Sequence, residues 1–275
     1  MAHSLTAPDA LVGARIRDFV LLERVAGATY RASAPSGLVA IRLYAEPATV
    51  GAIELDLRHP ALARVVAAGP LDGDGDDGDI NSRYFVATEW IEGTPLALWS
   101  ARRAPWDVIR RVVGAIGAGL GALHARGLVH RDLTPRGVMI PARLATAAIV
   151  VDAIPAVDVA ADVDAPAPPR ATAPYAAPER AAGSPIDGRA DLYALGVILF
   201  ELLTGALPDE HGVSPRRRAP DRDIPHVADA LCAWLLARDP DARVPNAHVL
   251  AVTLGAATSE VGALAGATVD ARFQA

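Results

Sequence analysis

The chain has 275 residues, of which 52% are hydrophobic, and its formal net charge at pH 7 is -6. A chain of this length and hydrophobicity can bury a sizeable core, so intrinsic disorder is excluded as the default state. The acidic balance does not favour binding to nucleic acid or to an anionic membrane surface. The single cysteine, Cys232, cannot form an internal disulfide, and this is consistent with a reducing cytoplasm.

Neither a secretory signal nor a membrane span is predicted. The first residues lack a basic stretch followed by an apolar core. The longest apolar run, from Leu192 to Leu203, is interrupted by Glu201 and is too short to cross a bilayer. We therefore expect a cytoplasmic protein without a membrane segment.

Short strands are expected in the sequence up to about Trp90. Runs of β-branched and apolar residues, separated by turn residues, indicate this class of structure. The expected strands are Phe19 to Arg24, Thr29 to Ala32, Leu38 to Tyr44, Leu62 to Ala68 and Tyr84 to Trp90, with a turn at Gly27. A helix is expected between the third and fourth strands, from Ala48 to Leu57.

Helices are expected to dominate after Pro105. Apolar residues recur at helical spacing from Ile109 to Leu123, which predicts a buried helix that ends near Gly127. Two short strands and a proline- and alanine-rich loop should follow, at Val138 to Ile140, Ala148 to Val151 and Pro155 to Pro174. The later helices are expected at Asp191 to Leu203, Val227 to Ala237 and Asn246 to about Val261. The predicted fold class is therefore α+β, with strands first and helices second.

Ordered motifs narrow this prediction. They are Val39-Ala40-Ile41-Arg42, His130-Arg131-Asp132-Leu133, Ala177-Pro178-Glu179, Asp191 to Gly196 followed by Glu201 to Gly205, and Asp239 to Arg243. The first three are similar to the V-A-I-K, H-R-D-L and A-P-E signatures of protein kinases. The whole set resembles a bacterial, actinobacterial-type Ser/Thr protein kinase domain, from about Leu11 to Ala257.

This resemblance implies one protein-kinase-like domain over residues 1–275, with two lobes. The small antiparallel β-rich N-lobe would span 11–91, the mainly helical C-lobe 92–257, and a tail 258–275. The segment from Glu89 to Gly93 would form the hinge between the lobes.

The resemblance also assigns roles to single residues. Asp132 corresponds to the catalytic base, Arg42 stands in place of the phosphate-binding lysine, and Asp152 corresponds to the aspartate that holds Mg²⁺. Nucleotide contacts are expected from Gly27, Ala40, Thr88, Glu89 and Ile91. Structural roles are expected for His130, Arg131, Glu179, Asp191 and Arg243, with Arg243 pairing with Glu179. Simpler alternatives are an exposed surface arginine for Arg42, a core histidine for His130 and a helix N-cap for Asp191.

Several positions depart from the family pattern where the triphosphate would be held. The chain contains no lysine, because all 26 of its basic residues are arginines. A guanidinium is bulkier and flatter than an ammonium, so Arg42 is not a conservative replacement. Thr134 replaces the lysine that follows the catalytic aspartate, and Gly137 replaces a metal-binding asparagine. The glycine-rich loop retains only Gly27, although close backbone approach to phosphate normally requires several glycines.

Two further motifs are altered. The D-F-G motif is Asp152-Ala153-Ile154. The glutamate that pairs with the strand lysine in the family falls on Val50, and Glu54, one helical turn later, is the alternative partner for Arg42.

These departures predict a degraded kinase domain, that is, a pseudokinase that acts as a regulatory or protein-binding signalling module and not as an enzyme. Handling of ATP and Mg²⁺ should be impaired, and no cofactor is expected. The expected partner is another signalling protein, such as an active kinase or a phosphopeptide-reading domain. One alternative is a weakly active Ser/Thr protein kinase that binds ATP and Mg²⁺ weakly through Arg42, Asp132 and Asp152. Another is a different transfer chemistry with the nucleotide bound in an altered orientation.

Overall fold

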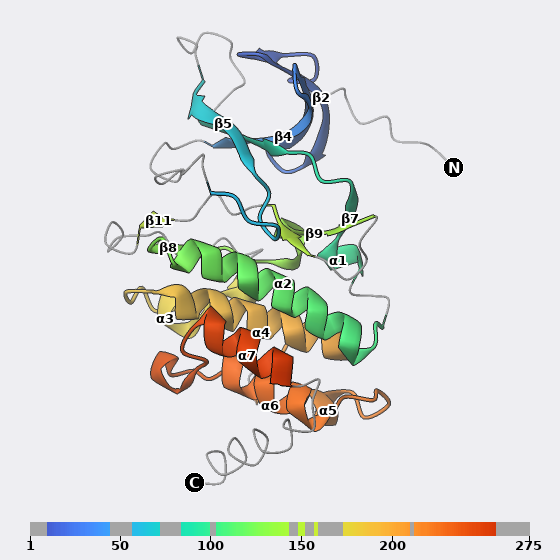
Figure 1. Ribbon diagram of the computed structural model, residues 1–275, viewed down its shortest axis with the longest axis vertical. Helices are drawn as coiled ribbons and strands as arrows, with labels where there is room; N and C mark the ends of the chain where they lie inside the picture. Colours follow the sequence, from blue (N-terminus) through green and yellow to red (C-terminus); the bar gives the residue numbers. More distant parts are fainter. Residues whose placement is uncertain are drawn as a thin grey trace. The chain divides into compact units, whose positions relative to one another are not determined.

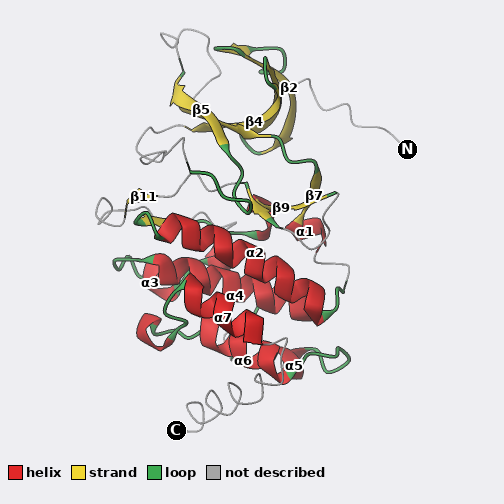
Figure 2. Cartoon of the chain, in the orientation of Figure 1, coloured by secondary structure: helices red, strands yellow, loops and turns green. Residues whose placement is uncertain are grey.

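The computed structural model describes residues 10–44, 57–71, 84–99, 103–142, 148–151, 157–158, 173–209 and 212–256. The chain divides into two compact units, one formed by residues 1–58 and 63–91 and the other by residues 59–62 and 92–275. Figure 2 shows that strands dominate the first unit and helices the second. The division differs from the expected one because residues 59–62 belong with the second unit.

An antiparallel sheet forms the first unit (Figure 1). Its strands lie in the order β1-β2-β3-β4-β6-β5, and all neighbouring strands are antiparallel. Their bounds are β1 (Arg15–Ile16), β2 (Phe19–Ala26), β3 (Thr29–Ala34), β4 (Gly37–Tyr44), β5 (Val65–Pro70) and β6 (Tyr84–Glu89). The expected strands before Tyr44 and after Tyr84 are thus confirmed to within two residues.

Alternating burial explains the central strand β4. Val39, Ile41 and Leu43 are buried in the core of the first unit, together with aromatic residues of the neighbouring strands. Because successive side chains of a strand point to opposite faces, Ala40 and Arg42 lie on the other face of β4. The alternation visible in the sequence therefore indicates correctly which face of this strand is buried.

The fourth expected strand was misplaced by several residues. β5 begins at Val65 and not at Leu62, because Leu62 forms a bridge with Val150 of the second unit. In the same segment, the backbone nitrogen of Val150 donates to the carbonyl oxygen of Ala61 at 2.9 Å. The helix expected before this strand falls almost entirely outside the described residues.

Helices make up most of the second unit. They are α1 (Leu96–Trp99), α2 (Trp106–His124), α3 (Pro178–Ala181), α4 (Gly188–Thr204), α5 (Pro215–Arg218), α6 (His226–Leu235) and α7 (Ala247–Ala256). Short 3-10 turns are η3 (Pro135–Gly137), η5 (Ala173–Tyr175) and η6 (Pro240–Ala242). The strands β7 (Gly93–Pro95), β9 (Val138–Pro141) and β10 (Ile149–Val150) form one small sheet, and β8 (Leu128–Val129) pairs with β11 (Val157–Asp158). The sequence did not predict β11, because a strand of two residues leaves no periodic pattern.

The core of the second unit is built around α4. This helix is buried along most of its length and packs against α2 and α6, beside which it lies in Figure 1. Asp187 is its N-cap and accepts a hydrogen bond from the backbone nitrogen of Arg189. Asp191 lies in the first turn, so the alternative that it is the N-cap is wrong. Gly205 ends the helix in a left-handed conformation with φ of 78°.

The expected helices α2, α6 and α7 are confirmed in type. α6 and α7 begin within one residue of the expected positions, whereas α2 begins at Trp106, three residues before the periodic stretch that starts at Ile109. The short helices α1, α3 and α5 were not predicted. The part of the last expected helix beyond residue 256 lies outside the described residues. No helix in the described part of the chain is both long and apolar enough to cross a membrane.

A glycine sets the distance between α4 and α6. A Cβ atom at Gly196 would lie 2.7 Å from the Cβ of Leu235, which is too close for two carbon atoms. We predict that Gly196→Ala lowers the free energy of unfolding by about 1–3 kcal/mol, because the helices must separate or distort. Chemical denaturation measures this change. Gly114→Ala on α2 is the control, since its Cβ would make an ordinary contact at 3.7 Å. Alanine is the better helix former by about 1 kcal/mol, so the control should not be destabilised. Equal effects at the two positions would contradict the prediction.

Candidate functional site

The buried carboxylate of Asp191 holds the H-R-D loop, which we define as residues 130–137. Only 1% of Asp191 is exposed. Its Oδ2 accepts a hydrogen bond from the backbone nitrogen of His130 at 2.8 Å, and its Oδ1 accepts one from Arg131 at 2.7 Å. The Nε2 atom of His124, at the end of α2, lies 2.8 Å from Oδ2. One side chain of α4 therefore joins the end of α2 to the start of the loop.

These contacts keep Asp191 ionised. Burial alone would raise the pKa of this carboxyl, but the hydrogen bond with His124, the nearby imidazoles and the backbone N–H of His130 hold the pKa below its ordinary value. N–H donors around a carboxyl group favour its ionised form over its protonated form. Asp191 is thus a structural anion in the core of the second unit.

The backbone of Arg131 adopts a left-handed conformation with φ of 70°. For a residue with a side chain, this conformation costs about 1–3 kcal/mol, so it needs support from its surroundings. Support comes from both sides of the residue: Asp191 accepts its N–H, and the guanidinium of Arg180 donates to its carbonyl oxygen. Burial and the nearby Arg180 lower the pKa of Arg131, although Asp191 opposes this shift.

An arginine lies beside Asp132, the residue at the position of the catalytic base. Nη1 of Arg180, on α3, is 3.9 Å from Oδ1 of Asp132. The side chains are 14% and 23% exposed, respectively, so water only partly screens this ion pair. The sequence analysis did not predict this contact. The position of Arg180 directly after Glu179 of the A-P-E motif was the one available signal.

The rest of the H-R-D loop offers few groups for phosphate or metal. Thr134 directly precedes η3 and is buried, and it lacks the ammonium group of the lysine that it replaces. Gly137 is buried as well. Its backbone N–H donates to the carbonyl oxygen of Thr134, and its carbonyl oxygen accepts a hydrogen bond from the backbone nitrogen of Val151. His130 is fully buried, and its Nδ1 accepts a hydrogen bond from the backbone nitrogen of Asp132 at 3.3 Å.

A second ion pair fastens the A-P-E motif to the second unit. Arg243 donates from Nη1 and Nη2 to the two carboxylate oxygens of Glu179, at 2.8 and 3.1 Å. The Arg243 side chain is 0% exposed, and it also donates to the carbonyl oxygens of Ala237 and Arg189. The expected contact between Arg243 and Glu179 is therefore present, in the bidentate geometry that suits guanidinium and carboxylate.

A tyrosine provides another anchor for the same segment. The hydroxyl of Tyr175, in η5, donates to the Glu201 carboxylate on α4 at 2.8 Å. Burial, followed by this hydrogen bond, raises the pKa of Tyr175, so it remains a neutral donor at physiological pH. The A-P-E segment is thus held by polar contacts on both sides of Pro178.

The nucleotide-contact candidates of the first unit lie on or beside its sheet. Ala40 on β4 is directly opposite Thr88 on β6, and Thr88 is buried. Glu89, at the end of β6, accepts a hydrogen bond from the backbone nitrogen of Arg64 at 3.0 Å. Ile91 follows β6 as the last residue of this unit. Strand pairing brings Ala40 and Thr88 together, and the nucleotide roles of these residues stay predictions.

Arg42 and Gly27 complete this set. The guanidinium carbon of Arg42 lies 5.5 Å from the ring centroid of Tyr44, a distance typical of a cation–π contact. Gly27 forms the turn between β2 and β3 with φ of 51°, which glycine adopts readily. Val50, Glu54 and Asp152 lie outside the described residues, so the expected partner of Arg42 and the expected metal aspartate are not placed.

The described residues do not fit a divalent metal site. No group of three or more His, Cys, Asp or Glu side chains within the described ranges could hold a metal ion. In the H-R-D loop, Asp132 is the only carboxylate, and Arg180 lies beside one of its oxygens. Gly137 supplies no side-chain oxygen, although Mg²⁺ requires oxygen ligands in near-octahedral geometry.

Together, the antiparallel sheet, the helical unit around α4 and the anchored H-R-D and A-P-E motifs define a kinase-like domain. A protein kinase domain description matches residues 79–253. The chain therefore belongs to the protein kinase family.

Known proteins support this assignment at the levels of sequence and fold. The chain is 34% identical over 225 residues to the Ser/Thr-protein kinase Pkn1 of Myxococcus xanthus, covering 75% of this chain and 32% of Pkn1. It is 30% identical over 223 residues to PksC of Streptomyces coelicolor, covering 70% of this chain and 37% of PksC. The chain thus spans about a third of the length of these relatives.

A solved structure confirms the fold. A single-site mutant of the PknI kinase domain of Mycobacterium tuberculosis superimposes with a TM-score of 0.68, covering 90% of this chain and 98% of that one, at 23% identity. The expected α+β, two-lobed kinase fold is therefore confirmed. The resemblance to bacterial Ser/Thr kinases is confirmed as well, by the relatives named above.

The native pKa of Asp191 predicts how its contribution to stability depends on pH. The pKa of Asp191 is lower in the folded chain than in the unfolded chain, where it has the ordinary aspartate value of about 4. The ionised carboxylate therefore stabilises the fold above about pH 4, and this contribution is lost as the pH falls toward the native pKa. We predict that Asp191→Asn is destabilised by about 3 kcal/mol or more at pH 7, because a buried charged acceptor is lost. The difference from the wild type should shrink below about pH 4. Urea unfolding between pH 7 and pH 3 measures it, with exposed Asp18→Asn as the control. A difference that does not change with pH would refute the prediction.

The contact between Arg180 and Asp132 is open to a double-mutant cycle. We predict a coupling energy of about 0.5–1 kcal/mol between Arg180→Gln and Asp132→Asn, as expected for a partly buried ion pair. The free energy of unfolding of the wild type and three variants gives this value. A cycle of Arg180→Gln with Asp221→Asn is the control, since these residues share no partner in the structure. The coupling energy of this control cycle should be near zero. An equally small coupling energy between Arg180→Gln and Asp132→Asn would show that the ion pair contributes nothing to stability.

Proposed function

We propose that this kinase-family chain is a pseudokinase that works as a regulatory or protein-binding signalling module in the cytoplasm, with impaired handling of ATP and Mg²⁺. The single observation behind the proposal is the composition of the H-R-D loop. Thr134 and Gly137 stand at the positions where the family has a lysine and a metal-binding asparagine. In addition, Arg180 lies beside the carboxylate of Asp132. The partner we propose is another signalling protein, such as an active kinase or a phosphopeptide-reading domain.

The physical basis is the dependence of phosphoryl transfer on charge. The enzyme must position the phosphates and neutralise them with cations and metal ions, since little covalent help is needed from the protein. Each lost electrostatic contact to the transition state typically costs about 3–4 kcal/mol. Losing a lysine, a metal ligand and most of the glycine-rich loop therefore reduces the rate by many orders of magnitude.

The residues that stabilise the second unit show the opposite pattern. Asp191 still holds the H-R-D loop, and Arg243 still pairs with Glu179. A domain that retains these buried contacts keeps a defined surface for partners even when its phosphate chemistry is impaired. This combination supports a binding role over an enzymatic one.

The alternative is a weakly active Ser/Thr protein kinase. It is favoured by the presence of Asp132 and by the naming of relatives such as Pkn1 and PksC as Ser/Thr-protein kinases. In that case Arg180 would supply the positive charge beside the catalytic base Asp132. It would do so from α3, whereas the family's lysine stands at the position of Thr134.

Thermal unfolding with nucleotide tests the proposal. A ligand at ten times its dissociation constant stabilises a protein by about 1.4 kcal/mol. That amounts to several degrees in Tm for a protein of this size. We predict a shift below about 1 °C with 1 mM ATP and 10 mM Mg²⁺ or Mn²⁺, because the phosphate contacts are depleted. The kinase domain of a relative such as Pkn1 is the positive control.

A phosphate-incorporation assay separates the two functions. Transfer of radiolabelled phosphate from ATP to the chain itself or to a general protein substrate should remain at background. Metal-dependent stabilisation, together with labelling that disappears in Asp132→Asn, would overturn the pseudokinase proposal in favour of the weak kinase.

A further inference from the structure

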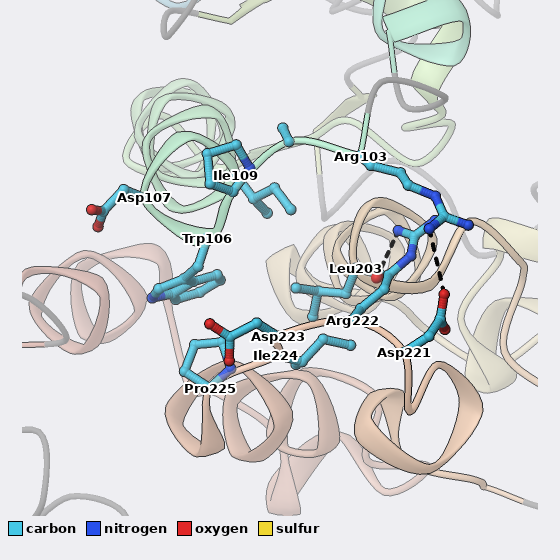
Figure 3. Close-up of a pocket in the computed structure, with 12 residues that line it drawn as sticks. Arg103, Trp106, Asp107, Ile109, Leu203, Asp221, Arg222, Asp223, Ile224 and Pro225 are labelled. Atoms are coloured by element: carbon cyan, nitrogen blue, oxygen red, sulfur yellow. Dashed lines mark hydrogen bonds and ion pairs between the residues drawn. The ribbon is translucent and has the colours of Figure 1, made fainter.

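The second unit contains a surface cavity that is separate from the H-R-D loop. It lies between the start of α2, the end of α4 and the segment that leads into α6 (Figure 3). Its volume is about 520 Å³. This is within the range of about 300–1,000 Å³ that is usual for ligand sites. None of the residues to which the kinase resemblance assigns a catalytic, nucleotide-binding, metal-binding or structural role lines it.

The floor of the cavity is apolar. Ile109 of α2, Leu203 of α4 and Ile224 contribute to the lining, and all three residues are buried. Figure 3 shows their side chains directed toward the space between the three segments. Because these three residues are already almost fully buried, the apolar surface that a ligand would cover is mainly that of Pro105, Trp106 and Pro225, which also line the cavity.

The two arginines of the cavity already have partners. Nη1 of Arg103 lies 3.4 Å from the Asp221 carboxylate. Nη1 of Arg222 donates to the carbonyl oxygens of Leu202 and Leu203, at 3.3 and 2.8 Å, at the end of α4. Their positive charges are therefore compensated by a carboxylate and by the negative end of a helix.

A carboxylate without a partner lies on the opposite side of the cavity. Asp223 is exposed and makes no ion pair or hydrogen bond within the described part of the chain. Trp106 lines the same cavity, and Figure 3 shows it on the same side as Asp223, with Arg103, Asp221 and Arg222 across the cavity. An aromatic ring and an unpaired carboxylate that line one cavity both attract a positive group, the ring through its quadrupole and the carboxylate through its charge.

We propose that this cavity is a docking site for a basic segment of a partner protein. An arginine or lysine side chain would place its cationic head between Trp106 and Asp223. Its aliphatic stem and a neighbouring apolar side chain would pack on Pro105, Trp106 and Pro225, as long basic side chains do on apolar surface. This inference rests on the proposed function in one respect, because it names the chemistry of the partner for a protein-binding module.

Titration with short peptides tests the proposal in the absence of nucleotide. The probes are acetyl-Ala-Leu-Arg-Leu-Ala-amide and matched peptides with glutamine or glutamate in place of arginine. The readout is the NMR signal of the Trp106 indole N–H in the ¹⁵N-labelled full chain, assigned by its absence in Trp106→Phe. We expect saturable shifts with the arginine peptide, and binding that weakens when NaCl is raised, because the contact is electrostatic.

Variants locate the contact. Asp223→Asn should weaken binding of the arginine peptide by about five-fold or more, through loss of the unpaired charge. Trp106→Ala should weaken it by a similar factor, followed through signals other than that of Trp106. Trp106→Phe should bind better than Trp106→Ala, because a ring face remains. Asp18→Asn, an exposed carboxylate of the first unit outside the cavity lining, is the charge-matched control and should bind like the wild type.

Three results would overturn the proposal. The first is equal binding of the arginine and glutamine peptides, which would remove the charge requirement. The second is preference for the glutamate peptide, which would indicate an acidic partner for Arg103 and Arg222. The third is ethylguanidinium binding as tightly as the peptide, which would indicate a small cation and no protein segment. Because no nucleotide is present, failure here leaves the thermal test of the pseudokinase proposal intact, and failure of that test leaves this one interpretable.

Discussion

The second unit depends on one buried anion. Asp191, in the first turn of α4, accepts the N–H groups of His130 and Arg131 and contacts His124 at the end of α2. An ionised carboxylate is costly to bury unless its oxygens are hydrogen-bonded, and here both oxygens are. The same contacts compensate the left-handed backbone of Arg131. The position of Asp132 follows directly, because it is the next residue in the chain.

Arginine performs the cationic roles in a chain without lysine. At Arg243 this suits the geometry, since a planar guanidinium can bond both oxygens of Glu179 at once. Arg180 contacts both the carbonyl oxygen of Arg131 and the carboxylate of Asp132 through its Nη1 atom. The sequence contains no lysine, so it has no compact side-chain ammonium for contact with the transferred phosphate. Arginine therefore supplies the buried ion pairs of the scaffold, and the absence of lysine is one basis of the proposal that phosphate handling is impaired.

The contrast between scaffold and chemistry is consistent along the chain. Buried polar contacts fasten the A-P-E segment to α4 and to Arg243, whereas the loop positions at Thr134 and Gly137 lack the groups that phosphate and metal require. The cavity beside Trp106 extends this contrast, because it offers unpaired charge and apolar surface away from the H-R-D and A-P-E motifs. It is the surface to which we assign the proposed protein partner.

The sequence by itself determined the fold class, the order of the longer strands and helices, and the family. Alternation along Val39, Ile41 and Leu43 and helical spacing from Ile109 to Leu123 are local patterns, so they can be recognised without neighbours. Only the tertiary structure decided that Leu62 pairs with Val150, that Asp187 and not Asp191 caps α4, and that Arg180 reaches Asp132. These contacts join residues from different elements or depend on where a helix begins, and spacing along the chain does not record such distances. The cavity beside Trp106 has the same origin, because it is formed where three separate segments meet.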